Sequence, residues 1–155
     1  MDVDEKLLAT LKISKFEKHV EIVMKNTKGE RKRAILFLCE YSPFHPGPET
    51  IDELLNQGTS FIPVKYPDNS FQIINLKEIL FVKELESIEK IGKINLLIYL
   101  ENGVQIEASI FEALPEHYGR TLDFFNINKT FLPLLYHSSR LYINKENVIK
   151  VEEIT

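Results

Sequence analysis

Thr50-Ile-Asp-Glu-Leu-Leu-Asn56 is followed in the chain by Phe61-Ile-Pro-Val64, Phe71-Gln-Ile-Ile-Asn75 and Ile79-Leu-Phe-Val82. A matching series comes later, as Thr121-Leu-Asp-Phe-Phe-Asn126, Phe131-Leu-Pro-Leu134, Leu141-Tyr-Ile-Asn144 and Val148-Ile-Lys-Val151. Thr, Asp, Asn, Phe, Pro and a second Asn recur in the same order, with apolar residues at matching positions. Such internal similarity is typical of repeat architectures. The sequence therefore predicts an internal duplication.

Each repeat also begins with a predicted β-hairpin. Residues 20–26 and 31–40 are joined by Thr27-Lys-Gly29, and residues 94–100 and 104–110 by Glu101-Asn-Gly103. Alternating or continuous apolar residues on both sides of a Gly-containing turn favour paired strands. A helical turn and three short strands complete each repeat. Each repeat is therefore predicted to have five strands, and the chain ten.

Five short strands are typical of a small barrel, in which closure removes exposed strand edges. We expect an all-β fold with short helices, in which two tandem SH3-like or Sm-like barrels are related by pseudo-two-fold symmetry. The expected boundaries are an N-terminal helix over 1–13, a first barrel over 14–83, a linker over 84–93 and a second barrel over 94–155.

The helical turn of the first repeat has its own start and stop signals. Thr50 and Glu53 have the spacing of a capping box, and Asp52 adds negative charge to the first turn. Asn56 is expected to end the helix in the left-handed conformation. Beyond the turn, Phe61 and Phe131 open apolar strands, and both are predicted to lie in the core.

Composition narrows the class of protein. The chain has 155 residues, of which 44% are hydrophobic and 27% charged, as in soluble globular proteins. A net charge of −4 provides no overall attraction for phosphates or anionic membranes. Cys39 is the only cysteine, and no apolar run approaches the roughly 20 residues of a membrane span. Because the N-terminus is acidic and lacks the features of a secretory signal, we expect a cytoplasmic protein with no membrane contact.

One motif resembles a pattern found in families of uncharacterised bacterial proteins. In those families an Arg-x-x-Asp-x-Leu-Asn stretch precedes a Phe-Ile-x-Leu strand, and Arg120-Thr-Leu-Asp-Phe-Phe-Asn126 is its best match here. Glu49 stands at the position of the arginine in the first repeat. The resemblance spans both repeats and implies no particular activity.

The order of predicted strands is also similar to that of Sm-like domains, which bind RNA as rings. In those domains an Asp and an Asn contact a base, and an Arg-Gly pair follows the fourth strand. Asp52 with Asn56, and Asp123 with Asn126, are similar to the first feature. Asn75-Leu76 and Asn144-Lys145 occupy the region of the Arg-Gly pair. The resemblance makes RNA binding the alternative function.

Candidate catalytic and metal-binding residues are few. His45 and His117 lie in equivalent predicted loops near glutamates and could form a metal site or an acid–base pair. With one histidine in each of these loops and no ligand spacing on a helix, we interpret both as loop residues. Asp52 and Asp123 are interpreted as helix-capping carboxylates, and Cys39 as a small buried hydrophobe. We predict no catalytic residue, no metal site and no cofactor.

A basic cluster is confined to the first repeat. Lys28, Arg31, Lys32 and Arg33 surround the turn of the first hairpin. Under the RNA-binding alternative these four residues would contact phosphates. The corresponding stretch of the second repeat, residues 101–107, is acidic. A solvated hairpin is the favoured interpretation.

The sequence favours a non-enzymatic adaptor or regulatory module with a protein partner, because loops on rigid scaffolds commonly mediate recognition. The expected binding surface is the proline-rich loop Tyr41–Glu49 with its counterpart Leu114–Arg120. RNA is the alternative partner, a metal-dependent enzyme using His45 and His117 is the second alternative, and a homo-oligomer is left open. The residues predicted to contact the partner are Phe44, His45, Pro46, Gly47, His117, Tyr118 and Arg120.

Overall fold

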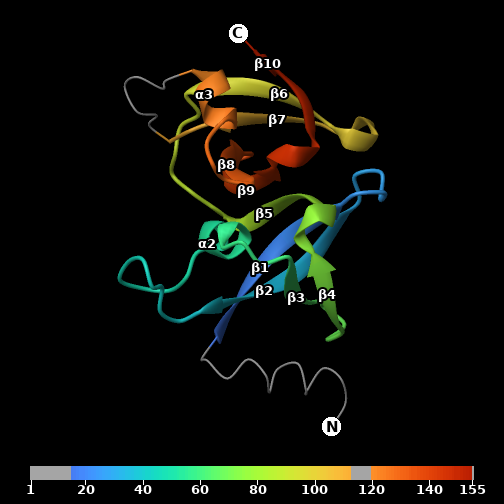
Figure 1. The fold of residues 1–155 in the computed structure, drawn as a ribbon, viewed down its shortest axis with the longest axis vertical. Helices are drawn as coiled ribbons and strands as arrows, with labels where there is room; N and C mark the ends of the chain where they lie inside the picture. Colours follow the sequence, from blue (N-terminus) through green and yellow to red (C-terminus); the bar gives the residue numbers. More distant parts are fainter. Residues whose placement is uncertain (1–14, 113–119, 155) are drawn as a thin grey trace.

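The computed structural model describes residues 15–112 and 120–154, and the helix predicted over residues 1–13 lies outside them. The described residues form ten β-strands, with two short α-helices and single 3-10 turns between them (Figure 1). The prediction of an all-β fold with short helices is therefore confirmed. None of the helices in the described ranges is long and apolar enough to cross a membrane.

We call residues 15–87 the first half of the chain and residues 94–154 the second half. The elements of the first half are β1 (Lys15–Met24), β2 (Arg31–Cys39), α2 (Ile51–Asn56), β3 (Phe61–Lys65), β4 (Phe71–Asn75), a 3-10 turn (Leu76–Glu78) and β5 (Ile79–Ser87). Those of the second half are β6 (Ile94–Leu100), a 3-10 turn (Glu101–Gly103), β7 (Gln105–Ile110), α3 (Thr121–Phe125), β8 (Phe131–Tyr136), β9 (Ser139–Asn144), a 3-10 turn (Lys145–Asn147) and β10 (Val148–Glu153).

All ten strands belong to one antiparallel sheet, in the order β10-β6-β7-β8-β9-β5-β1-β2-β3-β4. Within each half the last strand lies beside the first, and the other strands follow in sequence. The halves are joined where β5 pairs with β9, with Phe81 opposite Ile143 and Val82 opposite Tyr142. Because β9 pairs with β5 of the other half, the strands form one open sheet and not the two separately closed barrels that the sequence predicts.

The strand β5 is longer than the sequence predicts. It continues to Ser87, so residues 84–87 of the expected linker are strand. Glu84 is buried within this extension, where it accepts a hydrogen bond of 2.7 Å from the hydroxyl of Tyr142 on β9. The charged composition of residues 84–87 favoured a linker in the sequence analysis. The strand could not be predicted, because Tyr142, which pairs with the buried carboxylate of Glu84, lies 58 residues further along the chain.

The core consists of two clusters, and each cluster contains residues from both halves. Phe131 and Tyr142 of the second half pack among the buried residues of the first half. Val23, Leu80 and Phe81 of the first half pack among those of the second. Fully burying a large apolar side chain stabilises a fold by about 1.5–3 kcal/mol, so these five residues tie the halves together.

Phe61 and Phe131 have different environments although they occupy similar sequence positions. Phe131 is 1% exposed, as predicted, whereas Phe61 is 55% exposed, so the prediction of a core position for Phe61 is wrong. Phe131 lies on β8 next to the junction with β5, while Phe61 lies on β3 next to the edge strand β4. No strand among the described residues lies beyond β4 to cover it.

Candidate functional site

The proline-rich loop Tyr41–Glu49 leaves the sheet after β2 and returns to it at α2. Glu49 closes its base, because its N–H donates to the carbonyl oxygen of Cys39 at 2.9 Å and its carboxylate accepts from the N–H of Cys39 at 3.1 Å. Glu49 is buried. The loop therefore starts from a fixed base on the edge of the core (Figure 1).

Ser42 holds the middle of the loop. Its N–H donates to the carbonyl oxygen of Gly47 at 2.8 Å, and its hydroxyl donates to Glu53 at 2.7 Å. The same hydroxyl oxygen accepts from the N–H of Phe44 at 3.0 Å. Gly47 has φ +106°, a conformation that residues with a side chain rarely adopt. These contacts order the loop backbone before any partner binds.

His45 and Glu53 form an ion pair across the mouth of the loop. Nε2 of His45 contacts Oε1 of Glu53, and Nδ1 lies 2.9 Å from the carbonyl oxygen of Pro46. The hydrogen bond to Pro46, followed by that to Glu53, raises the pKa of His45 above its ordinary value of 6.5. Burial alone would raise the pKa of Glu53, but hydrogen bonds from Ser42 and His45 outweigh it and lower that pKa.

This pair predicts a pH dependence of the loop. Charged His45 stabilises the loop fully below pH 6.5, and this contribution is lost as the pH rises through its raised pKa. Glu53 contributes above pH 4.5 and loses its effect as the pH falls through its lowered pKa. We expect an NMR titration of His45 to have its midpoint above 6.5, and Glu53→Gln to move it toward 6.5.

Glu40→Gln is the control for this titration, since it removes a carboxylate just before the loop, whereas the imidazole bonds to Pro46 and Glu53. The Pro46 carbonyl remains in Glu53→Gln, so only part of the shift should disappear. An unchanged midpoint in Glu53→Gln would contradict the ion pair.

Two aromatic side chains project from this ordered loop. Tyr41 and Phe44 are each 79% exposed. Exposed single apolar residues are common, but two aromatic rings on a hydrogen-bonded loop lose little conformational entropy on binding. Aromatic residues are enriched at the centres of protein interfaces. The loop is therefore suited to insert rings into pockets of a partner.

The helix α2 supports the loop and also contacts the second half. Thr50 caps it as predicted, accepting from the N–H of Glu53 at 3.2 Å. The prediction that Asn56 ends it in the left-handed conformation is wrong, because Gly58 takes that conformation, with φ +92°. Asn56 instead bonds the backbone of Phe131 twice, with N–O distances of 3.0 and 2.9 Å. This role was not visible in the sequence, since the two residues are 75 positions apart.

A pocket of about 430 Å³ lies beside the base of the loop, between α2 and the strands that join the halves. Most of its charged side chains are paired with each other or with neighbours, whereas Glu112 and Arg140, which also line it, form no ion pair within the described residues. Lys18 contacts Glu86 and lies 3.6 Å from Glu84, and Asp52 pairs with Lys129 at 3.1 Å. Burial, followed by the charge of Glu84, raises the pKa of Tyr142, so its hydroxyl stays protonated and donates to that carboxylate. These contacts fix the positions of the carboxylates of Asp52, Glu84 and Glu86.

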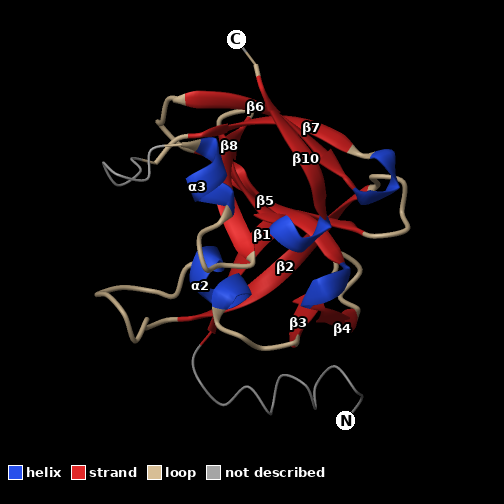
Figure 2. Cartoon of the chain, turned by 45° about the horizontal axis from the view of Figure 1, so that its top comes forward, coloured by secondary structure: helices blue, strands red, loops and turns tan. Residues whose placement is uncertain are grey.

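The predicted site residues are only partly brought together. Phe44, His45, Pro46 and Gly47 share the proline-rich loop, while Arg120 caps α3, with its Nε 2.9 Å from Asp123. This hydrogen bond lowers the pKa of Asp123. The helices α2 and α3 lie on the same side of the molecule (Figures 1 and 2). His117 and Tyr118 lie outside the described residues.

The four basic residues of the RNA-binding alternative do not form one patch. They occupy the turn and the start of β2, where neighbouring side chains point to opposite faces. The guanidinium of Arg31 contacts Tyr136, and the ammonium of Lys32 lies 4.2 Å from the ring of Tyr66. Arg33 lies opposite Glu21 on β1. A phosphate backbone would meet Arg31 and Lys32 already engaged, and the charges at the start of β2 divided between two faces.

Within residues 15–112 and 120–154, no group of three or more His, Cys, Asp or Glu is placed to hold a metal ion. Comparison with protein-family models, curated proteins and solved structures gave no match. The resemblances to the bacterial families and to Sm-like domains stay predictions.

Proposed function

We propose that the chain is a non-enzymatic protein-interaction module, an adaptor or regulatory subunit of the cytoplasm. The observation that supports this best is the proline-rich loop, which is ordered by its own hydrogen bonds and exposes Tyr41 and Phe44. Ordering before binding reduces the entropy lost when a partner docks. The paired carboxylates of the neighbouring pocket support a structural role for that region.

We further infer that the two halves are tandem copies of one small barrel-like unit of the SH3-like or Sm-like kind. Their identical strand order supports this, as does the short helix between the second and third strands of each half. A 3-10 turn also precedes the last strand of each half, at Leu76–Glu78 and Lys145–Asn147.

Affinity capture from a lysate of the native cell tests the proposed function. We expect protein partners that survive ribonuclease treatment and are depleted at least roughly tenfold by the pair Tyr41→Ala and Phe44→Ala, the loss typical of an interface hot spot. Ile91→Ala is the matched control, because Ile91 is also exposed but lies outside the loop. The Ile91→Ala variant should capture the same proteins, in the same amounts, as the unmodified chain.

Two outcomes would overturn the proposal. Partners retained by the aromatic variants would move the interface away from the loop. Enriched RNA, with proteins lost on ribonuclease digestion and binding that weakens steeply with salt, would favour the RNA-binding alternative.

A further inference from the structure

Among the described residues, the sheet has two edge strands with no strand on their outer side, and they come from different halves. β4 ends the sheet in the first half and β10 ends it in the second. Figure 1 shows β10 in the upper part of the molecule and β4 in the lower part. An unpaired edge presents backbone N–H and C=O groups that another strand can bond.

The counterparts of these two edges pair with each other inside the chain. β5 is the last strand of the first half, as β10 is of the second, and β9 is the fourth strand of the second half, as β4 is of the first. β5 and β9 form the junction between the halves. The molecule therefore contains one β5–β9 junction. It also carries the two strands that would form a second such junction, and residues 15–112 and 120–154 supply no partner for their outer edges.

Side chains as well as strands hold the internal junction. The amide of Asn56 donates to the carbonyl oxygen of Phe131 and accepts from its N–H. The amide of Asn144 donates to the carbonyl oxygen of Ile79 at 3.0 Å, while its oxygen caps the following 3-10 turn at 3.1 Å. Both asparagines reach backbone groups of the opposite half.

The counterparts of these asparagines, Asn75 at the end of β4 and Asn126 after α3, have the same local geometry. Asn126 corresponds to Asn56, and each donates its amide to the carbonyl four residues earlier at 3.0 Å. Asn75 corresponds to Asn144, and its oxygen likewise caps a 3-10 turn, at 3.0 Å. Within the described residues, neither Asn75 nor Asn126 forms a side-chain hydrogen bond with the other half.

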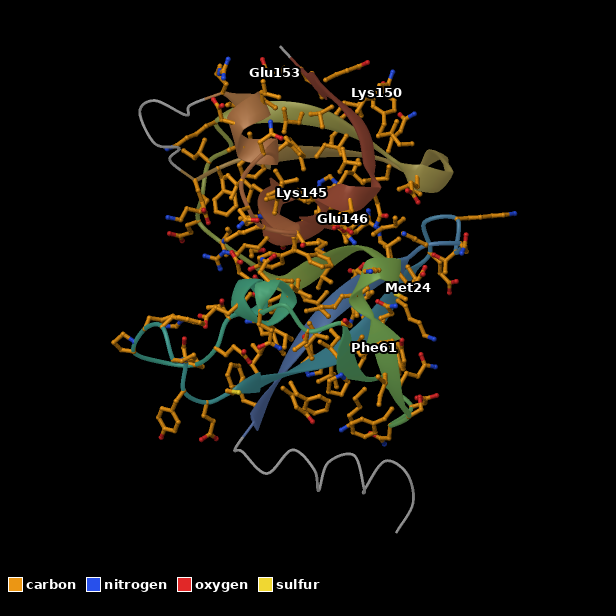
Figure 3. All side chains as sticks on the ribbon, in the orientation of Figure 1. Met24, Phe61, Lys145, Glu146, Lys150 and Glu153 are labelled. Carbon is orange, nitrogen blue, oxygen red and sulfur yellow. The ribbon has the colours of Figure 1, made fainter. Side chains whose placement is uncertain are left out.

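Exposed apolar side chains stand where the internal junction has buried ones. Phe61 and Ile73, next to or on the β4 edge, are 55% and 62% exposed, and they correspond to the buried Phe131 and Tyr142. Ile149 on β10 is 66% exposed and corresponds to the buried Leu80. Figure 3 shows Phe61 in the lower half of the molecule and, far from it, Lys150 and Glu153 on β10.

We propose that the chain associates head to tail, with β10 of one copy pairing antiparallel with β4 of the next. The register of the internal junction places Val151 opposite Ile73 and Lys150 opposite Ile74. Asn126 then bonds the backbone of Phe61 in the second copy, and Asn75 bonds the carbonyl of Val148. Such a contact uses two different surfaces, so it generates a closed ring or an open filament.

The contact between copies is weaker than the internal junction. Lys150 stands in place of the buried Phe81, and Thr59 in place of Lys129, which pairs with Asp52. A lysine on an edge strand opposes pairing but does not prevent it, because its stem can lie along the neighbouring strand. The association is therefore reversible and depends on concentration. It does not involve the proline-rich loop, so either proposal can fail without the other.

Sedimentation velocity of the full chain over a wide concentration range tests this association. We expect a mass that rises with concentration to at least twice the 18.0 kDa of one chain. Ile73→Lys and Ile149→Lys, each placing a charge on one exposed edge, should each remain monomeric. Ile91→Lys, at an exposed residue that lies on neither edge, should behave like the unmodified chain.

Mixing the two edge variants distinguishes a head-to-tail contact from a symmetric one. Ile73→Lys keeps an intact β10, and Ile149→Lys keeps an intact β4, so an equimolar mixture should form dimers and nothing larger. If either variant loses its cooperative thermal transition, Ile73→Ser and Ile149→Ser replace them. A monomeric unmodified chain, an unaffected edge variant or a mixture without dimers would overturn the proposal.

Discussion

Phe131→Ala is expected to destabilise the whole chain by about 3–5 kcal/mol, the usual cost of truncating a buried phenylalanine. Phe131 is 1% exposed and packs among core residues of the first half although it belongs to the second. The truncation removes the ring's apolar area and leaves a cavity between the halves. Urea denaturation followed by circular dichroism measures this loss, and the midpoint should fall with little change in slope.

Phe61→Ala is the matched control, because Phe61 has the corresponding position in the first half and is 55% exposed. At a concentration where the chain is monomeric, we expect it to cost about 1 kcal/mol or less. Equal losses in the two variants would contradict the assignment of Phe131 to a shared core. A denaturation curve with two separate transitions would show that the halves unfold independently.

Asn56→Ala is expected to lower the free energy of unfolding by about 2–3 kcal/mol. The substitution removes one donor and one acceptor from the backbone of Phe131, at 3.0 and 2.9 Å, in a partly buried setting. A polar group left without a partner away from water costs about 1–3 kcal/mol. Hydrogen exchange of the Phe131 N–H should also become faster in this variant, because that N–H loses its acceptor.

Asn126→Ala provides the comparison for Asn56→Ala. Asn126 corresponds to Asn56, but its side chain bonds locally, to the carbonyl oxygen of Leu122. We expect a loss of about 0.5 kcal/mol or less in the monomer and a roughly tenfold weaker association between copies, since two backbone hydrogen bonds would be absent. Equal destabilisation by the two substitutions would mean that the bonds of Asn56 to Phe131 do not hold the halves together.

Much of the secondary structure could be predicted because its signals are local. The ten expected strands all occur, and most have bounds within two residues of those expected, since alternation and turn residues act over a few positions. Thr50 could be recognised as a helix cap from neighbouring residues alone. The extension of β5 to Ser87 could not be predicted in this way, because Tyr142, the partner of Glu84, lies on a distant strand.

The candidate site was likewise predictable only where its signals are local. Prolines and Gly47 marked the loop Tyr41–Glu49 in the sequence, because these residues exclude regular structure. The hydrogen bonds that order the loop backbone could not be predicted, and this ordering involves residues outside the loop. It depends on Glu53, which the sequence marked as a helix-capping residue and the structure places against Ser42 and His45.

The sequence by itself determined the strands, the turns and the similarity of the two halves, since each depends on residues close together in the chain. Only the tertiary structure decided how the halves join. Pairing of β5 with β9 buries Phe131 and leaves Phe61 exposed, although the two residues have nearly the same sequence context. A strand's partner is set by long-range pairing and burial, which local patterns do not encode. For the same reason the sequence did not show that β4 and β10 are the outermost strands of the part of the chain that the structure describes.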